Sequence, residues 1–351
     1  MHIPDGYLAP QTTVPALAAM VPVWAVAFRK VKRTLSDKRV PALALSAAFA
    51  FVIMMFNVPI VGGSSAHAVG AVFISILLGP WAAVVSVSTA LLIQALVFGD
   101  GGILAFGMNC LNMAVIMPFS GYLVYKLICR DSKPGSRRSL IGSAVGSYVG
   151  LNLAALCASI EFGIQPLLFK TAEGSALYCP YPLSVSVPAM TMAHLLAAGP
   201  IEAVITTAAV AYIAKYAPQM FGNVKNNLPE ESLPVRTGTS FFSRYKVMLI
   251  PLIVLVVLTP IGLIATGSAW GEWSGEEIKK AVGYIPKGFA AMADKWNALM
   301  PDYSVPALGD GAAGSAAGYI LSAVVGIILI AGLILLTSLL VKKTRKEHEN
   351  H

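Results

Sequence analysis

The sequence predicts an all-α protein, a polytopic membrane helix bundle with about nine transmembrane spans, seven followed by two. Hydrophobic residues make up 56% of the 351 residues and charged residues only 12%, whereas soluble domains carry about 25% charged residues. Long apolar runs recur along the whole chain, and basic clusters separate some of them. The net charge of +8 does not indicate nucleic-acid binding, because membrane proteins concentrate basic residues in cytoplasmic loops.

The expected spans are apolar stretches that can cross a hydrocarbon core of about 30 Å. They are 12–28, 40–56, 68–78, 81–98, 104–128, 140–165, 186–214, 247–268 and 316–341. The third is short and ends at Gly79-Pro80, so it is either a partly buried half-span or a tight hairpin with the fourth. Small residues recur four apart in the second, as in Ala42, Ser46 and Ala50. They allow close helix approach, either within the chain or with a partner.

Three basic clusters orient the spans. They follow spans one, five and nine and contain Arg29, Lys30, Lys32, Arg33, Lys38 and Arg39; Arg130, Lys133, Arg137 and Arg138; and Lys342, Lys343, Arg345 and Lys346. With nine spans all three clusters fall on one face, which the positive-inside rule makes cytoplasmic. We therefore expect Met1 outside and His351 inside. The first ten residues lack the features of a signal peptide, and we expect Met1 to begin the mature chain.

A polar stretch divides the chain into two parts. We expect an N-terminal membrane domain over 1–215, a cytoplasmic linker over 216–246 and a two-span module over 247–351. The module's two spans flank an external loop, 269–315, which contains several Trp, Gly and Pro residues. Pro and Gly clusters are typical of such connections.

The start of the chain predicts a metal site. The amine of Met1, the backbone nitrogen of His2 and the His2 imidazole can close a five-membered and a six-membered ring around one ion. The amide must lose its proton, which Ni(II) and Cu(II) accept in tetragonal nitrogen sites. His67, in the expected external stretch 62–67, is the candidate fourth ligand. The alternative is that His2 and His67 are an ordinary terminal and an ordinary loop histidine.

Other polar residues are candidates for supporting roles. Ser64, Ser65, Asp100 and Asn109 are possible neighbours of the metal ligands, although we expect Asp100 mainly to form an external turn. Asn109 and Asn112 either bond to the metal-site loops or bridge helices. Glu161, His194 and Glu202 lie in or near spans six and seven, where ionisable groups are functional candidates. Hydrogen bonding between helices is the simpler expectation for these three.

The opening octapeptide, Met-His-Ile-Pro-Asp-Gly-Tyr-Leu, resembles the start of the CbiM/NikM family. These proteins are the substrate-binding S components of energy-coupling-factor (ECF) transporters for cobalt and nickel. The segment 62–70 resembles the family's second motif, with Ala66 where many members have Gly. Residues 247–341, including 266–273, resemble the small CbiN/NikN partner, here fused. The resemblance implies that Met1, His2 and His67 bind the metal.

The resemblance also implies partners and a location. It predicts a transmembrane T component and two ATPase subunits as partners, in a prokaryotic plasma membrane, and this chain itself contains no GxxxxGK[ST] P-loop. We expect capture of extracellular Ni(II), with Co(II) for cobalamin synthesis or a stand-alone metal permease as alternatives. The metal is cargo, and no resident cofactor is expected. An enzyme is disfavoured because HExxH and GxSxG motifs are absent.

Overall fold

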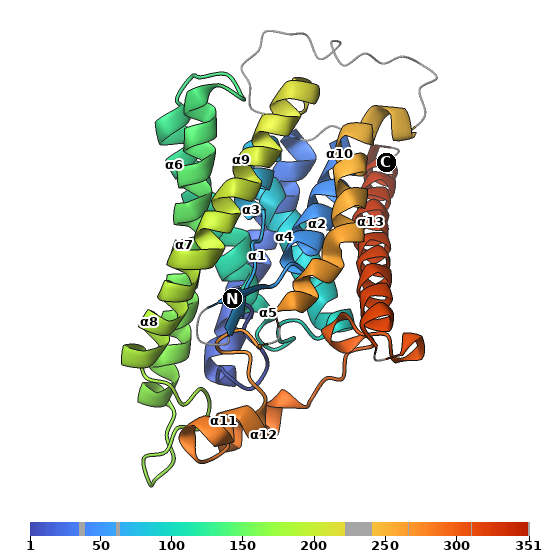
Figure 1. Ribbon diagram of the computed structural model, residues 1–351. Coiled ribbons are helices and arrows are strands. Elements are labelled where there is room, and N and C mark those ends of the chain that lie inside the picture. Colours follow the sequence, from blue (N-terminus) through green and yellow to red (C-terminus); the bar gives the residue numbers. More distant parts are fainter. Residues whose placement is uncertain (35–38, 61–63, 222–240, 266, 310, 350–351) are drawn as a thin grey trace.

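The fold is a bundle of long helices, which confirms the predicted all-α membrane class (Figure 1). The computed structural model describes residues 1–34, 39–60, 64–221, 241–265, 267–309 and 311–349. In these ranges the strands form a single two-stranded antiparallel hairpin, in which Val58 pairs with Ala66. Most of the expected linker, 216–246, lies outside the described residues, as do 62, 63 and 266 of the expected motifs.

The elements follow one another in the order that the apolar stretches predict. They are α1 (Pro10–Thr34), α2 (Val40–Met54), β1 (Val58–Ile60), β2 (Ser64–Ala66), α3 (Ala71–Leu78), α4 (Pro80–Ile93), η2 (Gln94–Phe98), α5 (Phe106–Asn109), η3 (Cys110–Ile116), α6 (Met117–Cys129), α7 (Arg137–Leu168), α8 (Leu183–Ala193), η4 (His194–Ala198), α9 (Gly199–Tyr216), η5 (Pro218–Met220), α10 (Phe241–Leu258), η7 (Thr259–Ile264), α11 (Gly275–Val282), α12 (Lys287–Ala293), η8 (Pro301–Tyr303), η9 (Pro306–Leu308) and α13 (Ala312–Glu349).

Each of the nine predicted stretches contains a helix in its described residues, but the helices differ in length. Within the described ranges, seven helices are long and apolar enough to cross a membrane, and α2 is a shorter apolar helix. Helix α3 has 8 residues and spans only about 12 Å at 1.5 Å per residue. Gly79, with φ 95°, joins it directly to α4. The third stretch is therefore both a half-length helix and one arm of a tight hairpin.

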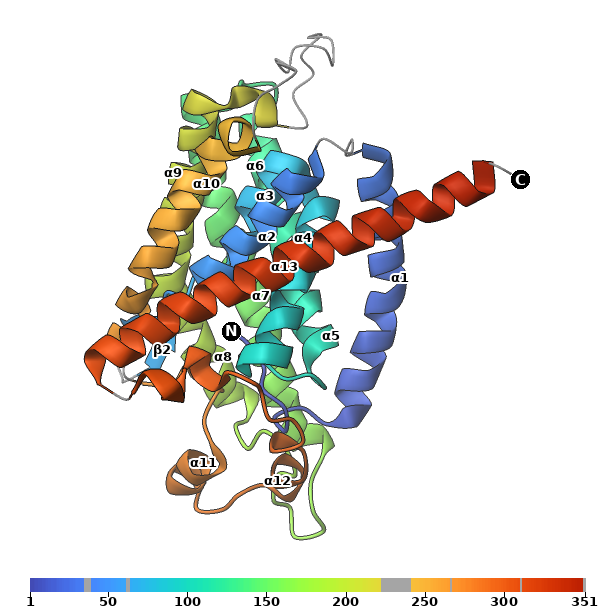
Figure 2. The same cartoon turned by 90° about the vertical axis from the view of Figure 1, so that its right-hand side faces the viewer.

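The C-terminal helices pack against the N-terminal domain. Helix α13 crosses α2 obliquely (Figure 2), and a Cβ at Gly326 would overlap the ring of Phe51. The small residues of α2 face the interior, and α2 packs against α4 and α13. The close approach that Ala42, Ser46 and Ala50 predict thus occurs within the chain.

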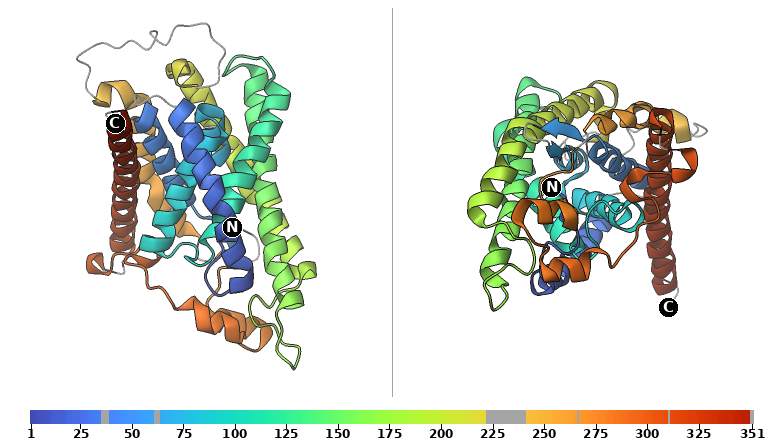
Figure 3. Two further views of the ribbon diagram at one scale, coloured as in Figure 1. Left: turned by 180° about the vertical axis from the view of Figure 1, so that it is seen from behind. Right: turned by 60° about the horizontal axis from the view of Figure 1, so that its bottom comes forward.

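One end of the bundle is covered by the connection between α10 and α13. Helices α11 and α12 lie across the end at which α1 begins (Figure 3). The chain's first residues turn back from that end into the bundle, so that the N-terminus lies among the helices (Figure 1). This arrangement brings the C-terminal module's loop next to residues 1–9.

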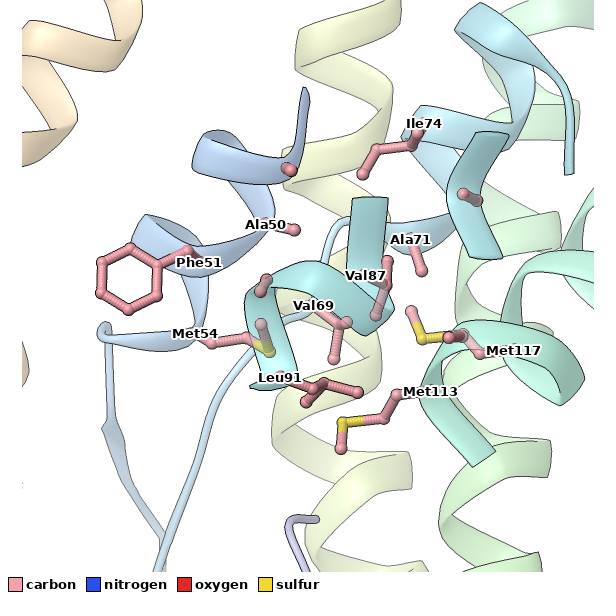
Figure 4. Packing of buried hydrophobic residues seen from close by; sticks show 14 of the residues in the cluster. Ala50, Phe51, Met54, Val69, Ala71, Ile74, Val87, Leu91, Met113 and Met117 are labelled. Atoms are coloured by element: carbon pink, nitrogen blue, oxygen red, sulfur yellow. The ribbon is translucent and has the colours of Figure 1, made fainter. Parts of the chain in front are cut away.

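A core of buried apolar side chains surrounds the connection between β2 and α3. Val69 lies beside Val87, Leu91 and Met113, which come from α4 and η3 (Figure 4). Three π-helical segments, η2, η3 and η4, interrupt the neighbouring spans. Such segments re-aim side chains and are frequent at functional sites. They lie next to the polar residues described below.

Candidate metal centre

The N-terminal segment is buried in the bundle. Met1 is 2% exposed, His2 1% and Tyr7 0%. The sequence predicts that His2 and His67 lie on the external side of the membrane, and in the fold both side chains are buried, with His67 4% exposed. Ile3, Tyr7 and Leu8 are apolar, and their burial draws the polar ends of the segment inward with them.

The backbone of this segment is held by specific hydrogen bonds. The side chain of Asn109 accepts from the Ile3 N–H at 2.8 Å and donates to the Ile3 carbonyl at 3.1 Å. The Asp5 carboxylate accepts from the N–H groups of residues 103, 104 and 105 at 3.0, 2.8 and 3.2 Å. Burial raises the pKa of Asp5, and the three N–H donors oppose that rise. A Cβ at Gly102 would collide with Asp5, so only glycine fits there.

The His67 loop is fixed from α9. Glu202, fully buried, accepts from the N–H of Val69 at 2.7 Å and from that of Gly70 at 3.0 Å. It also accepts from the Thr206 hydroxyl at 3.1 Å. Gly70 has φ 74° and precedes α3, so the carboxylate sits at a helix N-terminus that favours negative charge. Glu202 thus positions the loop that carries His67.

The two histidines meet at this point. His67 Nε2 lies 3.2 Å from His2 Nδ1, and their ring centroids are 4.9 Å apart. His67 Nδ1 is 3.0 Å from the Ala68 carbonyl oxygen. A carbonyl only accepts, so Nδ1 carries the proton and the Nε2 lone pair faces His2. Burial, followed by the charges of His2 and the Met1 amine, lowers the pKa of His67, which keeps its imidazole neutral.

Two acidic side chains flank these nitrogens. Asp100 Oδ1 lies 3.0 Å from His2 Nδ1, and Glu272 Oε1 lies 3.2 Å from the Met1 amine. Burial acts to raise the pKa of Asp100, but the charge and hydrogen bond of His2 outweigh it, and the net shift is downward. Asp100 lies in the connection between η2 and α5, and it also contacts a predicted ligand.

Asp100 is oriented by the C-terminal module. Tyr303 Oη donates to Asp100 Oδ2 at 2.5 Å, and Gln94 Nε2 donates to the same oxygen at 3.1 Å. Tyr303 and its neighbour Asp302 have φ 59° and 52°, values that cost free energy for residues other than glycine. The backbone is thus strained at Tyr303, the residue whose hydroxyl bonds to Asp100.

The same loop touches the site at further points. The Trp270 N–H donates to Ser64 Oγ at 2.8 Å, and Tyr7 Oη donates to the Trp273 carbonyl at 2.9 Å. Sequence reasoning missed Glu272 and Tyr303. The segment 266–273 was singled out only as a resemblance to a partner protein, and nothing in its spacing pointed to Met1.

The remaining predicted residues have structural contacts. Ser65 is buried in β2 opposite Pro59. Asn112 donates to Glu161 at 2.8 Å and bridges helices, whereas Asn109 bonds to the metal-site segment. His194 Nδ1 lies 2.8 Å from the Met190 carbonyl oxygen, and its buried Nε2 has no hydrogen-bond partner among the described residues.

In the part of the chain that the structure describes, no group of three or more His, Cys, Asp or Glu side chains is placed to hold a metal ion. A metal at this point therefore needs main-chain nitrogens as well as imidazoles. Two nitrogens bound to one ion at about 2.0 Å, adjacent in a square plane, are about 2.8 Å apart. The 3.2 Å between His67 Nε2 and His2 Nδ1 is close to that spacing.

Comparison with known proteins identifies the family. Residues 2–220 match the family model described as CbiM, cobalt uptake substrate-specific transmembrane region. The chain belongs to the CbiM family. Residues 244–343 match a second family model, the PDGLE domain. The family resemblance of the opening octapeptide is thus confirmed, and the CbiM family is a transport family rather than an enzyme family.

Two relatives match this chain over nearly its whole length. The chain is 46% identical over 362 residues to the fused nickel transport protein NikMN of Rhodobacter capsulatus, covering 99% of both chains. It is 43% identical to a probable fused nickel transport protein of Lactiplantibacillus plantarum, covering 95% of this chain and 96% of the relative. A crystal structure described as a truncated transition metal transporter matches with 55% identity and a TM-score of 0.58, covering 61% of this chain and 99% of that one.

Proposed function

We propose that this CbiM-family chain captures extracellular Ni(II) as the substrate-specific subunit of an ATP-driven ECF importer. The observation that carries the proposal is the approach of His67 Nε2 to His2 Nδ1 at 3.2 Å, beside the amine of Met1. Support also comes from the relatives in Rhodobacter capsulatus and Lactiplantibacillus plantarum, which are described as a fused and a probable fused nickel transport protein.

The proposed ligands are four nitrogens. They are the Met1 amine, the deprotonated amide of His2, His2 Nδ1 and His67 Nε2. The ion takes the place of the proton that lies between His2 Nδ1 and its two neighbours, His67 Nε2 and Asp100. A nitrogen square plane with a deprotonated amide suits Ni(II). Co(II) is the second candidate, since relatives include proteins named cobalt transport protein CbiM.

The C-terminal module supports loading of the site. Glu272 Oε1 accepts a hydrogen bond from the Met1 amine, and Tyr303 donates to Asp100, which lies beside His2 Nδ1. For the metal to bind, the amine moves from Glu272 to the ion. The module thus contacts one proposed ligand directly and another through Asp100.

Transport needs other chains. The sequence has no P-loop, so a T component and two ATPase subunits supply the coupling, and membrane lipid surrounds the assembly. With Met1 on the outer side and the tail in the cytoplasm, the site lies toward the end of the bundle that faces the medium, and the loop with α11 and α12 covers that end. Reconstituted complexes should show nickel-stimulated ATP hydrolysis that the isolated chain lacks. Uptake by the isolated chain without ATP would favour the stand-alone permease instead.

The ligand set is tested by substitution. His67→Ala and His2→Ala should each weaken nickel binding by more than the roughly 10–100-fold typical of losing an outer-shell partner, as measured by isothermal titration. His194→Ala is the matched control, a buried histidine that should keep near wild-type affinity. Wild-type affinity in His67→Ala would refute the site. Competition between Ni(II) and Co(II) in cellular uptake would identify the preferred ion.

A further inference from the structure

A large apolar cavity lies between the two parts of the chain. Its volume is about 660 Å³, and its walls come from α2, α3, α9 and α10. Figure 1 shows α2 and α3 behind the space between α9 and α10. Nearly all the side chains that line it are aliphatic or aromatic; those used below are Phe49, Ala68, Ala208, Tyr212 and Val254.

The cavity opens sideways, at the depth of the membrane. Two of its walls, α9 and α10, belong to helices that are long and apolar enough to cross a membrane. Two lining residues of α10, Ile250 and Val254, are 48% and 51% exposed, so the mouth faces the surroundings of the bundle. Water is a poor occupant because each molecule needs 2–4 polar partners, and Tyr212 is the only lining residue with a polar side chain. The hydrocarbon of the bilayer is the medium that meets this mouth.

The volume suits a single lipid acyl chain. A methylene group is about the size of a water molecule, which takes about 30 Å³, so a cavity of about 660 Å³ has room for one chain of ordinary bilayer length. A helix of a partner protein lying across the open mouth is the competing occupant, and the crosslink below distinguishes it from lipid.

Basic and aromatic residues stand at one end of the cavity. Lys215 ends α9, with its Nζ 5.1 Å above the Tyr216 ring, and Lys246 lies near the start of α10, next to the lining residue Val247. The end of α9 and the start of α10 lie at the same end of the bundle (Figure 1). Basic residues at the membrane surface attract anionic headgroups. We propose that the cavity binds one acyl chain of an anionic phospholipid whose headgroup lies near Lys215 and Lys246.

The occupant would touch the metal loop. Ala68, which follows His67, lines the cavity, and so does Phe49, whose ring lies where a Cβ of Gly70 would be. An acyl chain at this position lies against the loop that carries His67, whose backbone Glu202 of α9 also holds. The inference concerns a lipid site and stands whether the transported ion is nickel or cobalt.

The first test fills the cavity with a larger side chain. Ala208→Phe places a ring in the space of the chain, and Val204→Phe, on the same helix but outside the lining and 68% exposed, is the matched control. The full chain is reconstituted in nanodiscs of phosphatidylglycerol and phosphatidylethanolamine, extracted mildly and weighed by native mass spectrometry. Wild type and Val204→Phe should retain phosphatidylglycerol, whereas Ala208→Phe should lose it. Retained nickel binding in Ala208→Phe shows that the variant folds.

A second arm tests headgroup and occupant. Lys215→Glu together with Lys246→Glu should abolish the preference for phosphatidylglycerol over phosphatidylethanolamine. A photoreactive benzoylphenylalanine at Val254 should crosslink to lipid in membranes that contain the whole transporter. Equal lipid retention by Ala208→Phe and wild type, or a crosslink to another protein chain, would overturn the proposal.

Discussion

Glu202 offers a sharp test of how the His67 loop is held. Glu202→Ala removes the acceptor for two buried N–H groups, those of Val69 and Gly70, bonded at 2.7 and 3.0 Å. A buried donor left without a partner costs about 1–3 kcal/mol, so the two together cost about 2–6 kcal/mol. If the loop moves so that these N–H groups find other partners, nickel binding must return the loop to its original position, and the free energy of that change weakens the binding. Since about 1.4 kcal/mol is a factor of ten, the lower bound predicts a loss of about 30-fold in nickel affinity.

The assay compares nickel affinity with thermal stability for matched variants. Thr206→Val removes only the hydroxyl bond to Glu202 and keeps both backbone bonds, so its affinity should stay close to wild type. Glu161→Ala removes another intramembrane carboxyl group, one bonded to Asn112 and not to the loop, and should also bind nickel normally. Wild-type affinity in a folded Glu202→Ala protein would refute the reasoning, because the loop would then keep its position without this acceptor.

Three further predictions concern the N-terminal segment, pH and orientation. Gly102→Ala should weaken nickel binding without unfolding the bundle, because its Cβ displaces Asp5; unchanged affinity by titration would contradict this. Nickel affinity should fall as pH is lowered, because binding displaces protons from the nitrogen donors. Burial lowers the pKa of His67 below its usual 6.5, so His67 stays neutral as the pH falls through that value. His67→Ala should therefore leave the slope of nickel affinity against pH unchanged. A flatter slope in this variant would show that the displaced protons come from His67. An impermeant thiol reagent applied outside cells should label Lys280→Cys and spare Lys133→Cys, both exposed positions; the reverse pattern would invert the orientation.

The sequence alone predicts the helices and the two histidines well, for physical reasons. Apolar length and turn residues locate each span, and Gly79-Pro80 marks the hairpin between α3 and α4. Met1-His2 has a chelating geometry by its covalent structure, independent of the fold. His67 Nε2 does face His2 Nδ1 at 3.2 Å, whereas metal binding by these groups stays a prediction.

The sequence could not predict the hydrogen-bond partners of the buried polar side chains. These partners depend on which backbone groups the fold leaves without a bond inside a helix. Asn109 and Asn112 lie three residues apart, and only the packed structure shows that one holds Ile3 and the other holds Glu161. From the sequence, Glu202 is only an ionisable residue in a membrane span. In the structure it accepts from N–H groups that lie 132 and 133 positions away in the chain. Tertiary hydrogen bonds of this kind leave no periodic pattern along the chain.

The burial of the N-terminus also depends on contacts between residues that are far apart in the chain. A terminal polar peptide is usually exposed, but here Asp5 and Asn109 satisfy its backbone and that of the neighbouring loop. Glu272 lies 271 residues from Met1. No spacing argument links residues so distant in the chain.

The most direct test of the account is the availability of the first amine. An N-terminal variant that keeps the formyl group on Met1 has no free amine to close the five-membered ring with the His2 amide, and the site around Met1, 2% exposed, has little space for the added group. Nickel titration followed by optical and magnetic measurement compares this variant with wild type and with a chain extended by one alanine at its C-terminus. The account predicts diamagnetic, yellow-to-orange nickel bound tightly by wild type and by the C-terminal variant, and loss of both properties in the N-terminal variant. Equal affinity and an unchanged spectrum in the N-terminal variant would show that the amine is not a ligand.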